Sequence, residues 1–380
     1  MAPPALLSPP AVMSSGPRNT LNFLQPIPTL RRDGDAIAIL DQTLLPFRSE
    51  IRCLASTSEV AEAIASMRVR GAPLIGATAA FGVAIALATE GSDDTTLERA
   101  LALLGATRPT AVNLHWALAR MDAVLRPLAP GLRPAAAWRE AEAIAADDAA
   151  TCAAIGSHGL PLLADIAAQR GRVRVMTHCN AGWLATCGAG TALAPVYAAH
   201  AQGIAVEVLV SETRPRNQGL LTAWELREAG VPHALIADNA AGLLLARGEV
   251  DIVITGADRI AANGDTANKV GTLLKGLAAR EAGVPFYIAA PHSTLDFACA
   301  DGTCIPIEDR GAGELCVVRG ICCDGEGDGR IAELRQAPAG TAVANPAFDV
   351  TPARLIGGII TERGIATPGE LRGLYPEQAR

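Results

Sequence analysis

The stretch VRVMTHCNAG, residues 173–182, marks the point at which the sequence changes from helical to strand patterning. It opens with a short apolar run, and four similar runs follow at VEVLV (206–210), HALI (233–236), VDIVI (250–254) and FYIA (286–289). Helical stretches separate these runs. Continuous apolar strands that alternate with helices are typical of a parallel sheet covered on both faces. We therefore predict a Rossmann-like parallel-sheet domain over residues 157–370.

The residues before this region have a mainly helical pattern. They predict a helix that stops at Gly71, a nearly all-apolar and therefore buried helix after it, and two more helices over 95–127 and 134–156. Residues 30–47 predict two short strands around a turn at Asp33, Gly34 and Asp35. The predicted fold class is thus α/β, with a mainly helical N-terminal domain and small antiparallel sheet (30–156) before the Rossmann-like domain. Residues 1–29 are Pro-rich and predict an irregular leader.

Composition excludes several classes of protein. Half of the 380 residues are hydrophobic and 19% are charged, which excludes a disordered chain. The net charge of −7 argues against a nucleic-acid binder driven by bulk electrostatics. We find no apolar run that approaches the roughly 18 residues of a membrane span, so no membrane partner is expected. Nine irregularly spaced cysteines fit a reducing cytosol, which predicts a cytoplasmic protein.

Polar clusters follow all five predicted strands, where ligands bind in open parallel sheets. The clusters are THCNAG (177–182), SETRP (211–215), DN (238–239), GADR (256–259) and HST (292–294). Helix capping explains Asp238 and Ser293 well. It explains Cys179, and Gln218 and Lys269 farther along, much less well. Lys269 is one of only two lysines in the chain.

Cofactor motifs match poorly. The string nearest to G-x-G-x-x-G is Gly188, Gly190 and then Leu193, which lacks the third glycine and does not follow a strand. No G-x-x-x-x-G-K-[ST] string occurs. Five cysteines crowd into residues 299–323 without a C-x₂-C pair, which favours buried thiols over a zinc site. The sequence therefore predicts neither a cofactor nor a metal.

Six segments together resemble the methylthioribose-1-phosphate isomerase family, a relative of the regulatory subunits of the guanine-nucleotide exchange factor of eukaryotic translation initiation. They are RGAPLIGATAAFG (70–82), TRPTAVNLHWAL (107–118), THCNAGWLAT (177–186), ETRPRNQGLLTAWEL (212–226), TGADRIAANGDTANKVGT (255–272) and NPAFDVTPARLI (345–356). The resemblance runs over about residues 30–365. It implies conversion of 5-methylthioribose 1-phosphate to 5-methylthioribulose 1-phosphate in methionine salvage, without cofactor or metal, by a homodimer.

The resemblance also implies roles for individual residues. Cys179 matches the catalytic cysteine of the family, and Asp258 matches its catalytic aspartate, a proton donor. The matches to substrate-binding positions are Arg70, Gly71, Ala72, Arg108, Gln218, Asn268 and Lys269.

These residue types suit the implied chemistry. A sugar phosphate dianion calls for guanidinium forks, an ammonium group and close backbone approach, which Arg70, Arg108, Lys269 and Gly71 can supply. The C1 phosphate locks the sugar as a closed ring, so opening needs a group that protonates the ring oxygen or stabilises the opened cation. A carboxylic acid kept protonated by an apolar site serves this purpose, and Asp258 follows an apolar strand. Cys179 is then the candidate base. Whether hydrogen moves from C2 to C1 as a proton or as a hydride stays open.

Other interpretations of the same residues stay open. Cys179 can be an inert buried thiol, Asp258 a helix N-cap, and the two arginines members of structural ion pairs. Trp183 stands where many relatives have a small residue, and it is a candidate, with the 71–82 helix, for the wall around the methylthio group. The substrate can instead be 5-deoxyribose 1-phosphate or ribose 1,5-bisphosphate. A non-catalytic regulatory protein, like the translation-factor relatives, is the remaining alternative.

Overall fold

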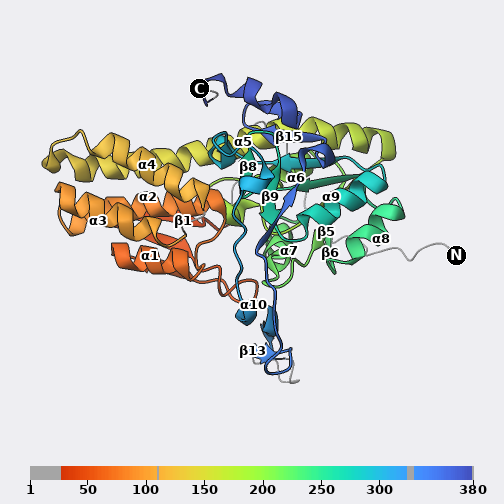
Figure 1. Ribbon diagram of the computed structural model, residues 1–380, viewed down its shortest axis with the longest axis horizontal. Coiled ribbons are helices and arrows are strands. Elements are labelled where there is room, and N and C mark those ends of the chain that lie inside the picture. Colours follow the sequence, from red (N-terminus) through yellow and green to blue (C-terminus); the bar gives the residue numbers. More distant parts are fainter. Residues whose placement is uncertain (1–26, 109–110, 323–328, 379–380) are drawn as a thin grey trace.

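The computed structural model describes residues 27–108, 111–322 and 329–378 (Figure 1). The first 26 residues of the predicted leader lie outside this range. In Figure 1 the helices within residues 57–125 lie side by side at one end of the molecule, the large sheet lies at the other, and the helix of residues 133–170 extends from the first end over the sheet. The fold class predicted from the sequence is confirmed: a helical N-terminal region with a small antiparallel sheet precedes a parallel-rich sheet region.

The N-terminal region contains a three-stranded antiparallel sheet and five helices. The strands are β1 (Leu30–Asp33), β2 (Ala36–Leu40) and β3 (Ile51–Leu54), and the helices are α1 (Thr57–Ala65), α2 (Ala72–Thr89), α3 (Asp94–Gly105), α4 (Val112–Leu125) and α5 (Arg133–Arg170). The turn predicted at Asp33, Gly34 and Asp35 joins β1 to β2, as expected.

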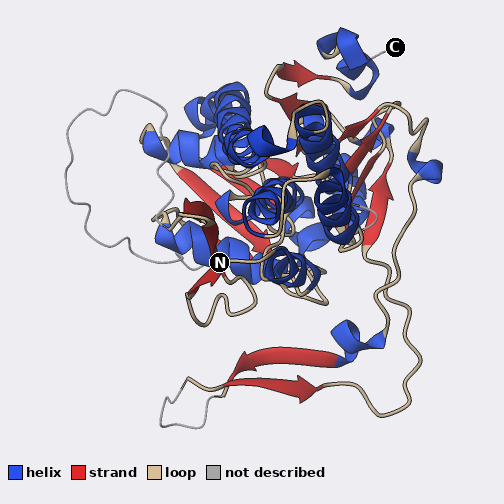
Figure 2. Cartoon of the chain, turned by 90° about the vertical axis from the view of Figure 1, so that its left-hand side faces the viewer, coloured by secondary structure: helices blue, strands red, loops and turns tan. Residues whose placement is uncertain are grey.

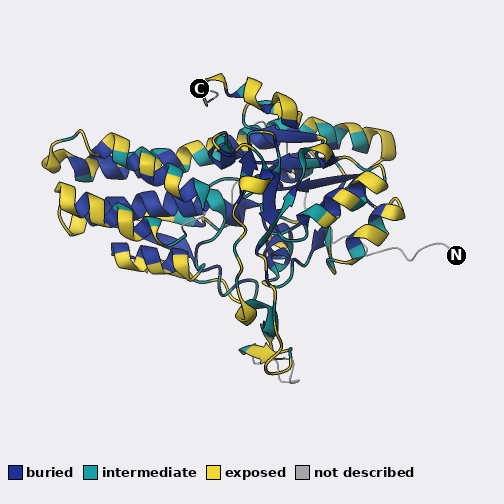
Figure 3. Ribbon diagram, viewed as in Figure 1, coloured by how far each residue is buried: buried dark blue, intermediate teal, exposed yellow. Residues whose placement is uncertain are grey.

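Helix α2 is the core of this region. It is apolar on all sides and buried continuously from Leu74 to Leu87, because α1, α3, α4 and α5 pack around it. By length and composition α2 is the one helix among the described residues that is apolar enough to cross a membrane. The expectation that no apolar run approaches that length was therefore wrong. Most of this helix is buried inside the protein, as Figure 3 shows.

Three helix boundaries differ from the prediction. The first helix ends at Ala65, and Gly71, with φ 95°, is the N-cap of α2 instead of a helix stop. The helix predicted over 95–127 is broken into two, because α3 ends at Gly105 and α4 begins only at Val112. The break places Arg108 in a loop. Helix α5 continues to Arg170, beyond the predicted end at residue 156.

The large sheet has seven strands in the order β16-β15-β10-β7-β4-β5-β6. Its strands are β4 (Val173–Thr177), β5 (Val206–Ser211), β6 (His233–Ile236), β7 (Ile252–Thr255), β10 (Phe286–Ala289), β15 (Gly358–Thr361) and β16 (Gly364–Ala366). All neighbours are parallel except β15 and β16. The first five strands follow the spatial order 3-2-1-4-5 of a doubly wound sheet. The five predicted strands are thus confirmed as neighbours in one sheet.

Helices cover both faces of this sheet. They are α6 (Ala194–Ala201), α7 (Gln218–Glu228), α8 (Ala240–Ala246) and α9 (Thr272–Glu281). Val175 of β4 packs in the cluster that contains α5, α6 and α7, whereas the next residue, Met176, packs in the cluster that contains α8 and α9. This alternation explains why the strands have no polar face in the sequence.

A smaller sheet and a projecting ribbon complete the chain. The sheet runs in the order β11 (Leu295–Asp296), β8 (Arg259–Ala261), β9 (Thr266–Lys269) and β14 (Phe348–Thr351). Helix α10 (Ala312–Cys316) leads into the ribbon of β12 (Val317–Ile321) and β13 (Ile331–Arg335), which Figure 2 shows standing away from the body. Short 3₁₀ turns lie at Pro130–Leu132, Trp183–Ala185, His292–Thr294, Gly302–Cys304, Ala353–Leu355, Pro368–Leu374 and Pro376–Gln378.

Candidate active site

The candidate site lies where the strand order of the large sheet reverses. Strand β4 pairs with β5 on one side and with β7 on the other, and the chain leaves β4 in one direction and later returns to β7. Such a reversal opens a crevice beyond the carboxyl ends of the two strands. Cys179 follows β4 and Asp258 follows β7, so both residues flank this crevice.

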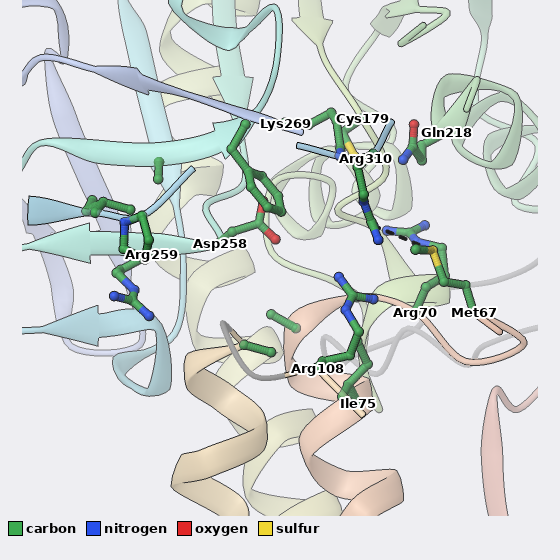
Figure 4. Close-up of a pocket in the computed structure, with 17 residues that line it drawn as sticks. Met67, Arg70, Ile75, Arg108, Cys179, Gln218, Asp258, Arg259, Lys269 and Arg310 are labelled. Carbon is green, nitrogen blue, oxygen red and sulfur yellow. Dashed lines mark hydrogen bonds between the residues drawn. The ribbon is translucent and has the colours of Figure 1, made fainter. Parts of the chain in front are cut away.

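A pocket occupies the crevice and extends to the start of α2 (Figure 4). Its lining residues are Met67, Arg70, Gly71, Ala72, Ile75, Arg108, Ala111, Cys179, Gln218, Asp258, Arg259, Ala267, Lys269, Ile305, Pro306, Arg310 and Phe348. Of the catalytic and substrate-binding residues that the resemblance implies, only Asn268 does not line it. Asn268 is buried beside Lys269 on β9, and its Nδ2 donates to Thr272 Oγ1 at 3.0 Å. Successive residues of a strand point to opposite faces, which separates the two side chains.

Cys179 is held by hydrogen bonds on both sides of its backbone. Its amide donates to Thr213 Oγ1 at 2.8 Å, and its carbonyl accepts from Thr222 Oγ1 at 2.8 Å. Its φ of 63° lies in the left-handed region, which non-glycine residues seldom adopt. The surroundings therefore fix an unfavourable conformation at the residue with the reactive side chain, as is common at functional sites.

Opposing influences act on the pKa of the Cys179 thiol. Burial raises the pKa of the Cys179 thiol, while the positive charges of Arg70 and Lys269 lower it. The negative charge of Asp258 acts on the same thiol and raises its pKa. The thiol and the carboxyl group therefore share one environment, although β4 and β7 supply them from distant parts of the chain.

Asp258 has the properties expected of a buried acid. Burial raises the pKa of the Asp258 carboxyl group, and the neighbouring cations, first Lys269 and then Arg108, lower it only in part. Its carboxyl oxygens make no hydrogen bond or ion pair that the structure records between described residues. Asp258 precedes strand β8 and caps no helix, so the helix-cap interpretation is wrong.

Arg70 is oriented by a buried polar network. Its Nη1 donates to Asn180 Oδ1 at 2.5 Å and its Nη2 to the Asn180 carbonyl at 2.9 Å. Asn180 in turn donates through Nδ2 to Glu225 Oε1 at 2.8 Å. Burial raises the pKa of Glu225 to about 8. A fixed guanidinium group therefore stands next to Cys179 with no carboxylate bound directly to it.

The start of α2 adds backbone groups to the same wall. Gly71 approaches the neighbouring backbone so closely that a Cβ atom there would lie 2.4 Å from Ala185 Cα. Only glycine fits this contact with φ 95°. Gly71 and Ala72 both line the pocket, and the first amide groups of a long helix favour a bound anion.

Several polar groups of the pocket have no partner among the described residues. Gln218 Oε1 and Arg310 Nε are buried without a hydrogen bond. Lys269 Nζ lies 4.6 Å from the centre of the Phe348 ring. Within the part of the chain that the structure describes, neither Arg70 nor Arg108 forms an ion pair, and the hydrogen-bond partner of the Arg70 guanidinium group is the neutral Asn180, so the structural ion-pair interpretation of these arginines has no support. Buried polar groups normally find partners, so the cationic groups of the pocket favour an anionic ligand and Gln218 Oε1 favours a hydrogen-bond donor.

The sequence reasoning missed part of the lining. Arg310 comes from an irregular segment, and its Nη1 lies 3.4 Å from Glu308 Oε1. The apolar lining comprises Met67, Ile75, Ile305, Pro306 and Phe348. Phe348 lies inside the NPAFDV segment singled out above, but nothing in the local pattern identified its side chain. Ile75 lies in the 70–82 segment, whose helix was a candidate for the wall around the methylthio group, and no motif pointed to Met67, Ile305 or Pro306.

The structure corrects the predicted roles of three other residues. Trp183 is fully buried and packs on Trp224 at 5.5 Å between ring centres, so it does not line the pocket. Asp238 does not cap a helix; its carboxylate accepts the amides of Thr213 and Arg214 at 2.8 and 2.7 Å. Ser293 accepts a hydrogen bond from Asn113 Nδ2 at 2.6 Å, away from the pocket.

Comparisons with known proteins agree with this picture. The profile of the Initiation factor 2 subunit family matches residues 68–368. The chain is 62% identical over 360 residues to the methylthioribose-1-phosphate isomerase of Dechloromonas aromatica, covering 93% of this chain and 98% of that protein. It is 55% identical to the enzyme of the same name from Methylobacterium nodulans, with 91% and 95% covered.

Solved structures give the same relationship. The crystal structure of 5-methylthioribose 1-phosphate isomerase from Pyrococcus horikoshii OT3 matches with a TM-score of 0.80 and 38% identity, covering 94% of this chain and 97% of that chain. The translation initiation factor eIF-2B subunit delta from A. fulgidus matches with a TM-score of 0.74 and 36% identity, covering 91% and 97%.

Proposed function

The chain belongs to the Initiation factor 2 subunit family and groups there with the methylthioribose-1-phosphate isomerases, and from this premise we propose how its pocket works. It is an aldose–ketose isomerase that converts 5-methylthioribose 1-phosphate to 5-methylthioribulose 1-phosphate, a step of methionine salvage. One observation supports the assignment most strongly. A thiol and a protonatable carboxyl group line one pocket together with Arg70, Arg108 and Lys269, none of which forms an ion pair with a carboxylate among the described residues.

The cations and the start of α2 bind the phosphate. Arg70 and Arg108 supply guanidinium forks, and Gly71 and Ala72 supply backbone amides at the helix N-terminus. Lys269 adds a compact ammonium group from the Asp258 side of the pocket. Figure 4 shows the charged ends of Arg70, Arg108 and Arg310 together on one side of the pocket. Gln218, whose Oε1 has no partner, binds a sugar hydroxyl.

Asp258 and Cys179 divide the proton transfers. Asp258 donates its proton to the ring oxygen as the bond between that oxygen and C1 breaks. Cys179, as the thiolate that the charges of Arg70 and Lys269 favour, accepts the proton that the C2 hydroxyl group or the C2 carbon releases. After the ketose forms, the Cys179 thiol loses this proton to solvent and the Asp258 carboxylate takes one up, which resets both groups. The hydrogen of C2 moves to C1, the C2 hydroxyl group becomes the ketone, and the former ring oxygen keeps the proton from Asp258. The balance needs no oxidant, because the same molecule is oxidised at C2 and reduced at C1.

The apolar lining accepts the methylthio group. Ile75 comes from α2, and Ile305, Pro306 and Phe348 come from the segments around the smaller sheet. These side chains give an uncharged substituent at C5 a better environment than they give a second phosphate group, whose desolvation is costly. This arrangement favours 5-methylthioribose 1-phosphate over ribose 1,5-bisphosphate.

The remaining expectations are part of the same proposal. We expect a cytoplasmic homodimer that acts on a small-molecule sugar phosphate without a cofactor or metal and without nucleic-acid or membrane partners. Size-exclusion chromatography with light scattering tests the dimer, and activity that persists after exhaustive treatment with a chelator tests the absence of a metal requirement.

The function is tested by direct conversion. The purified protein is incubated with 5-methylthioribose 1-phosphate, 5-deoxyribose 1-phosphate or ribose 1,5-bisphosphate, and ketose formation is followed by ¹H and ³¹P NMR without added cofactor. We expect the methylthio sugar to react with the highest kcat/KM. Faster conversion of another sugar would show that this sugar is the substrate instead. Conversion of none would favour the regulatory role of the translation-factor relatives. Deuterium from D₂O at C1 would favour the enolate route over hydride transfer.

A further inference from the structure

The hydroxyl group of Thr213 is buried and is hydrogen-bonded to the backbone of Cys179. Its Oγ1 accepts the Cys179 amide at 2.8 Å and donates to the Ser211 carbonyl at 2.9 Å. It also lies 3.4 Å from His178 Nδ1. Thr213 and His178 are both essentially inaccessible to solvent and do not line the pocket. The hydroxyl group therefore touches the backbone of the reactive residue without touching the ligand space.

Asp238 holds Thr213 in an unfavourable conformation. Thr213 has φ 66°, which is an outlier for a β-branched residue. Asp238 Oδ1 accepts the Thr213 amide at 2.8 Å and also the Ser211 hydroxyl, and Oδ2 accepts the amide of Arg214 at 2.7 Å. These hydrogen bonds to a carboxylate offset the cost of the left-handed backbone. These hydrogen bonds connect Asp238, which follows β6, to the residues at the end of β5, the strand that neighbours β4.

His178 defines which way the hydrogen bonds run. The carbonyl oxygen of Val270 can only accept, so His178 Nε2, 2.8 Å away, carries the proton. Burial, followed by the positive charge of Lys275, lowers the pKa of His178 to about 3. The ring is therefore neutral and Nδ1 is a bare acceptor. The hydroxyl hydrogen of Thr213 can therefore be accepted by the Ser211 carbonyl oxygen or by His178 Nδ1. A lone pair of the same hydroxyl oxygen accepts the Cys179 amide hydrogen.

We propose that Thr213 is a positioning residue for Cys179. Its hydroxyl group, anchored by Asp238, holds the backbone of residue 179 in the left-handed conformation that directs the thiol into the pocket. Figure 4 shows Cys179 among the residues that line the pocket, where the positive charges of Arg70 and Lys269 act on its thiol. The inference rests on the proposed function only where it concerns turnover, since the position of the thiol can be measured without a substrate.

The test compares Thr213→Val, which keeps the shape but removes the acceptor, with Thr213→Ser, which restores it. Thr361→Val is the matched control, because Thr361 Oγ1 also accepts a backbone amide (Arg363, 3.1 Å) and donates to a carbonyl (Gly364, 3.0 Å) but lies outside the pocket lining. Three quantities are measured: kcat, KM and the alkylation rate of Cys179 by iodoacetamide, read from its own peptide by mass spectrometry.

We expect Thr213→Val to lower kcat by about 10- to 100-fold with KM within about threefold, because a small misplacement of a reacting group has a large effect on rate. Its Cys179 alkylation slows at least about threefold as the sulfur leaves the field of the nearby cations. Thr213→Ser and Thr361→Val keep both rates within about threefold of wild type. If Thr213→Val does not fold, Thr213→Ala replaces it with the same expectation.

Two outcomes overturn the proposal. The first is wild-type alkylation and kcat in the folded Thr213→Val or Thr213→Ala protein. The second is failure of Thr213→Ser to restore either quantity. A wild-type protein that converts no sugar contradicts the proposed function instead, and the alkylation rates still decide whether Thr213 positions the thiol.

Discussion

The guanidinium groups of Arg108 and Arg310 share one pocket without a carboxylate that pairs with both. Burial, followed by the positive charge of Arg310, lowers the pKa of Arg108. Arg310 also has a buried Nε without a hydrogen bond, and its recorded carboxylate contact is the one with Glu308 at 3.4 Å. Two buried cations repel each other unless an anion binds between them. We propose that the substrate phosphate is that anion.

Arg310→Met should therefore weaken substrate binding more than it slows the chemical step. A hydrogen bond to a charged group contributes about 1.5–3 kcal/mol, so KM should rise by about 10- to 100-fold while kcat stays within about threefold. Steady-state kinetics and competitive inhibition by inorganic phosphate check this. Arg335→Met, on the exposed end of β13, is the control. An unchanged KM and phosphate inhibition constant would show that Arg310 does not bind the phosphate.

Replacement of Lys269 should change the pH dependence of turnover. Its positive charge is the largest influence that lowers the pKa of Asp258, and it also lowers the pKa of Cys179. Because loss of a nearby cation raises the pKa of a carboxyl group and of a thiol, both limbs of the kcat/KM profile of Lys269→Met should move to higher pH. Profiles between pH 5 and 10 measure this. A limb that moves to lower pH would contradict the arrangement of charges.

Gly71 should not tolerate a side chain. In Gly71→Ala the new Cβ would meet the Ala185 backbone at a φ of 95°, so we expect a loss of about 2–4 kcal/mol in the free energy of unfolding and a raised KM. Gly34→Ala is the control, because Gly34 has a φ of 65° but open space around it. It should lose only about 1–2 kcal/mol. Equal losses in the two variants, measured by denaturant unfolding, would argue against the close contact.

Asp148 should make folding stability depend on pH away from the pocket. Burial raises the pKa of Asp148 to about 6 from an ordinary value of 3.8. Between these values the folded protein keeps a proton that the unfolded chain releases, so stability falls as pH rises from about 4 to about 6, by at most about 3 kcal/mol. Asp148→Asn should remove this part of the slope, and the neighbouring exposed Asp147→Asn should not. Denaturant midpoints from pH 4 to pH 7 test it; the same slope in all three proteins would contradict the prediction.

The large sheet could be predicted because its strands are continuous apolar runs. A strand such as β7, buried on both faces, leaves a pattern that needs no tertiary information. Strand β9 has the sequence TANK, and its burial depends on partners that the local pattern does not contain. The break between α3 and α4, which places Arg108 at the pocket, was missed because the Ala- and Leu-rich helical pattern continues on both sides of it.

The site was predictable only in part. Cys179 and Asp258 follow strands, so the topology of parallel sheets places them at one edge. Arg310 and Ile305 reach the pocket from an irregular segment, and no periodicity reports where such a segment lies. The role of Asp238 was misread because an aspartate after a strand is so often a helix cap, whereas here it accepts hydrogen bonds from the neighbouring strand end. Only the three-dimensional structure distinguishes an aspartate that caps a helix from one that accepts hydrogen bonds from a neighbouring strand end.

The central claim is that Cys179 and Asp258 act on one sugar phosphate held by the cations around them. The most direct measurement combines calorimetric binding of 5-methylthioribose 1-phosphate with NMR detection of the ketose for wild type, Cys179→Ser and Asp258→Asn. We predict that both variants bind the sugar within about tenfold of the wild-type KM and that each forms ketose at least about 100-fold more slowly. Wild-type turnover in either variant would contradict the account.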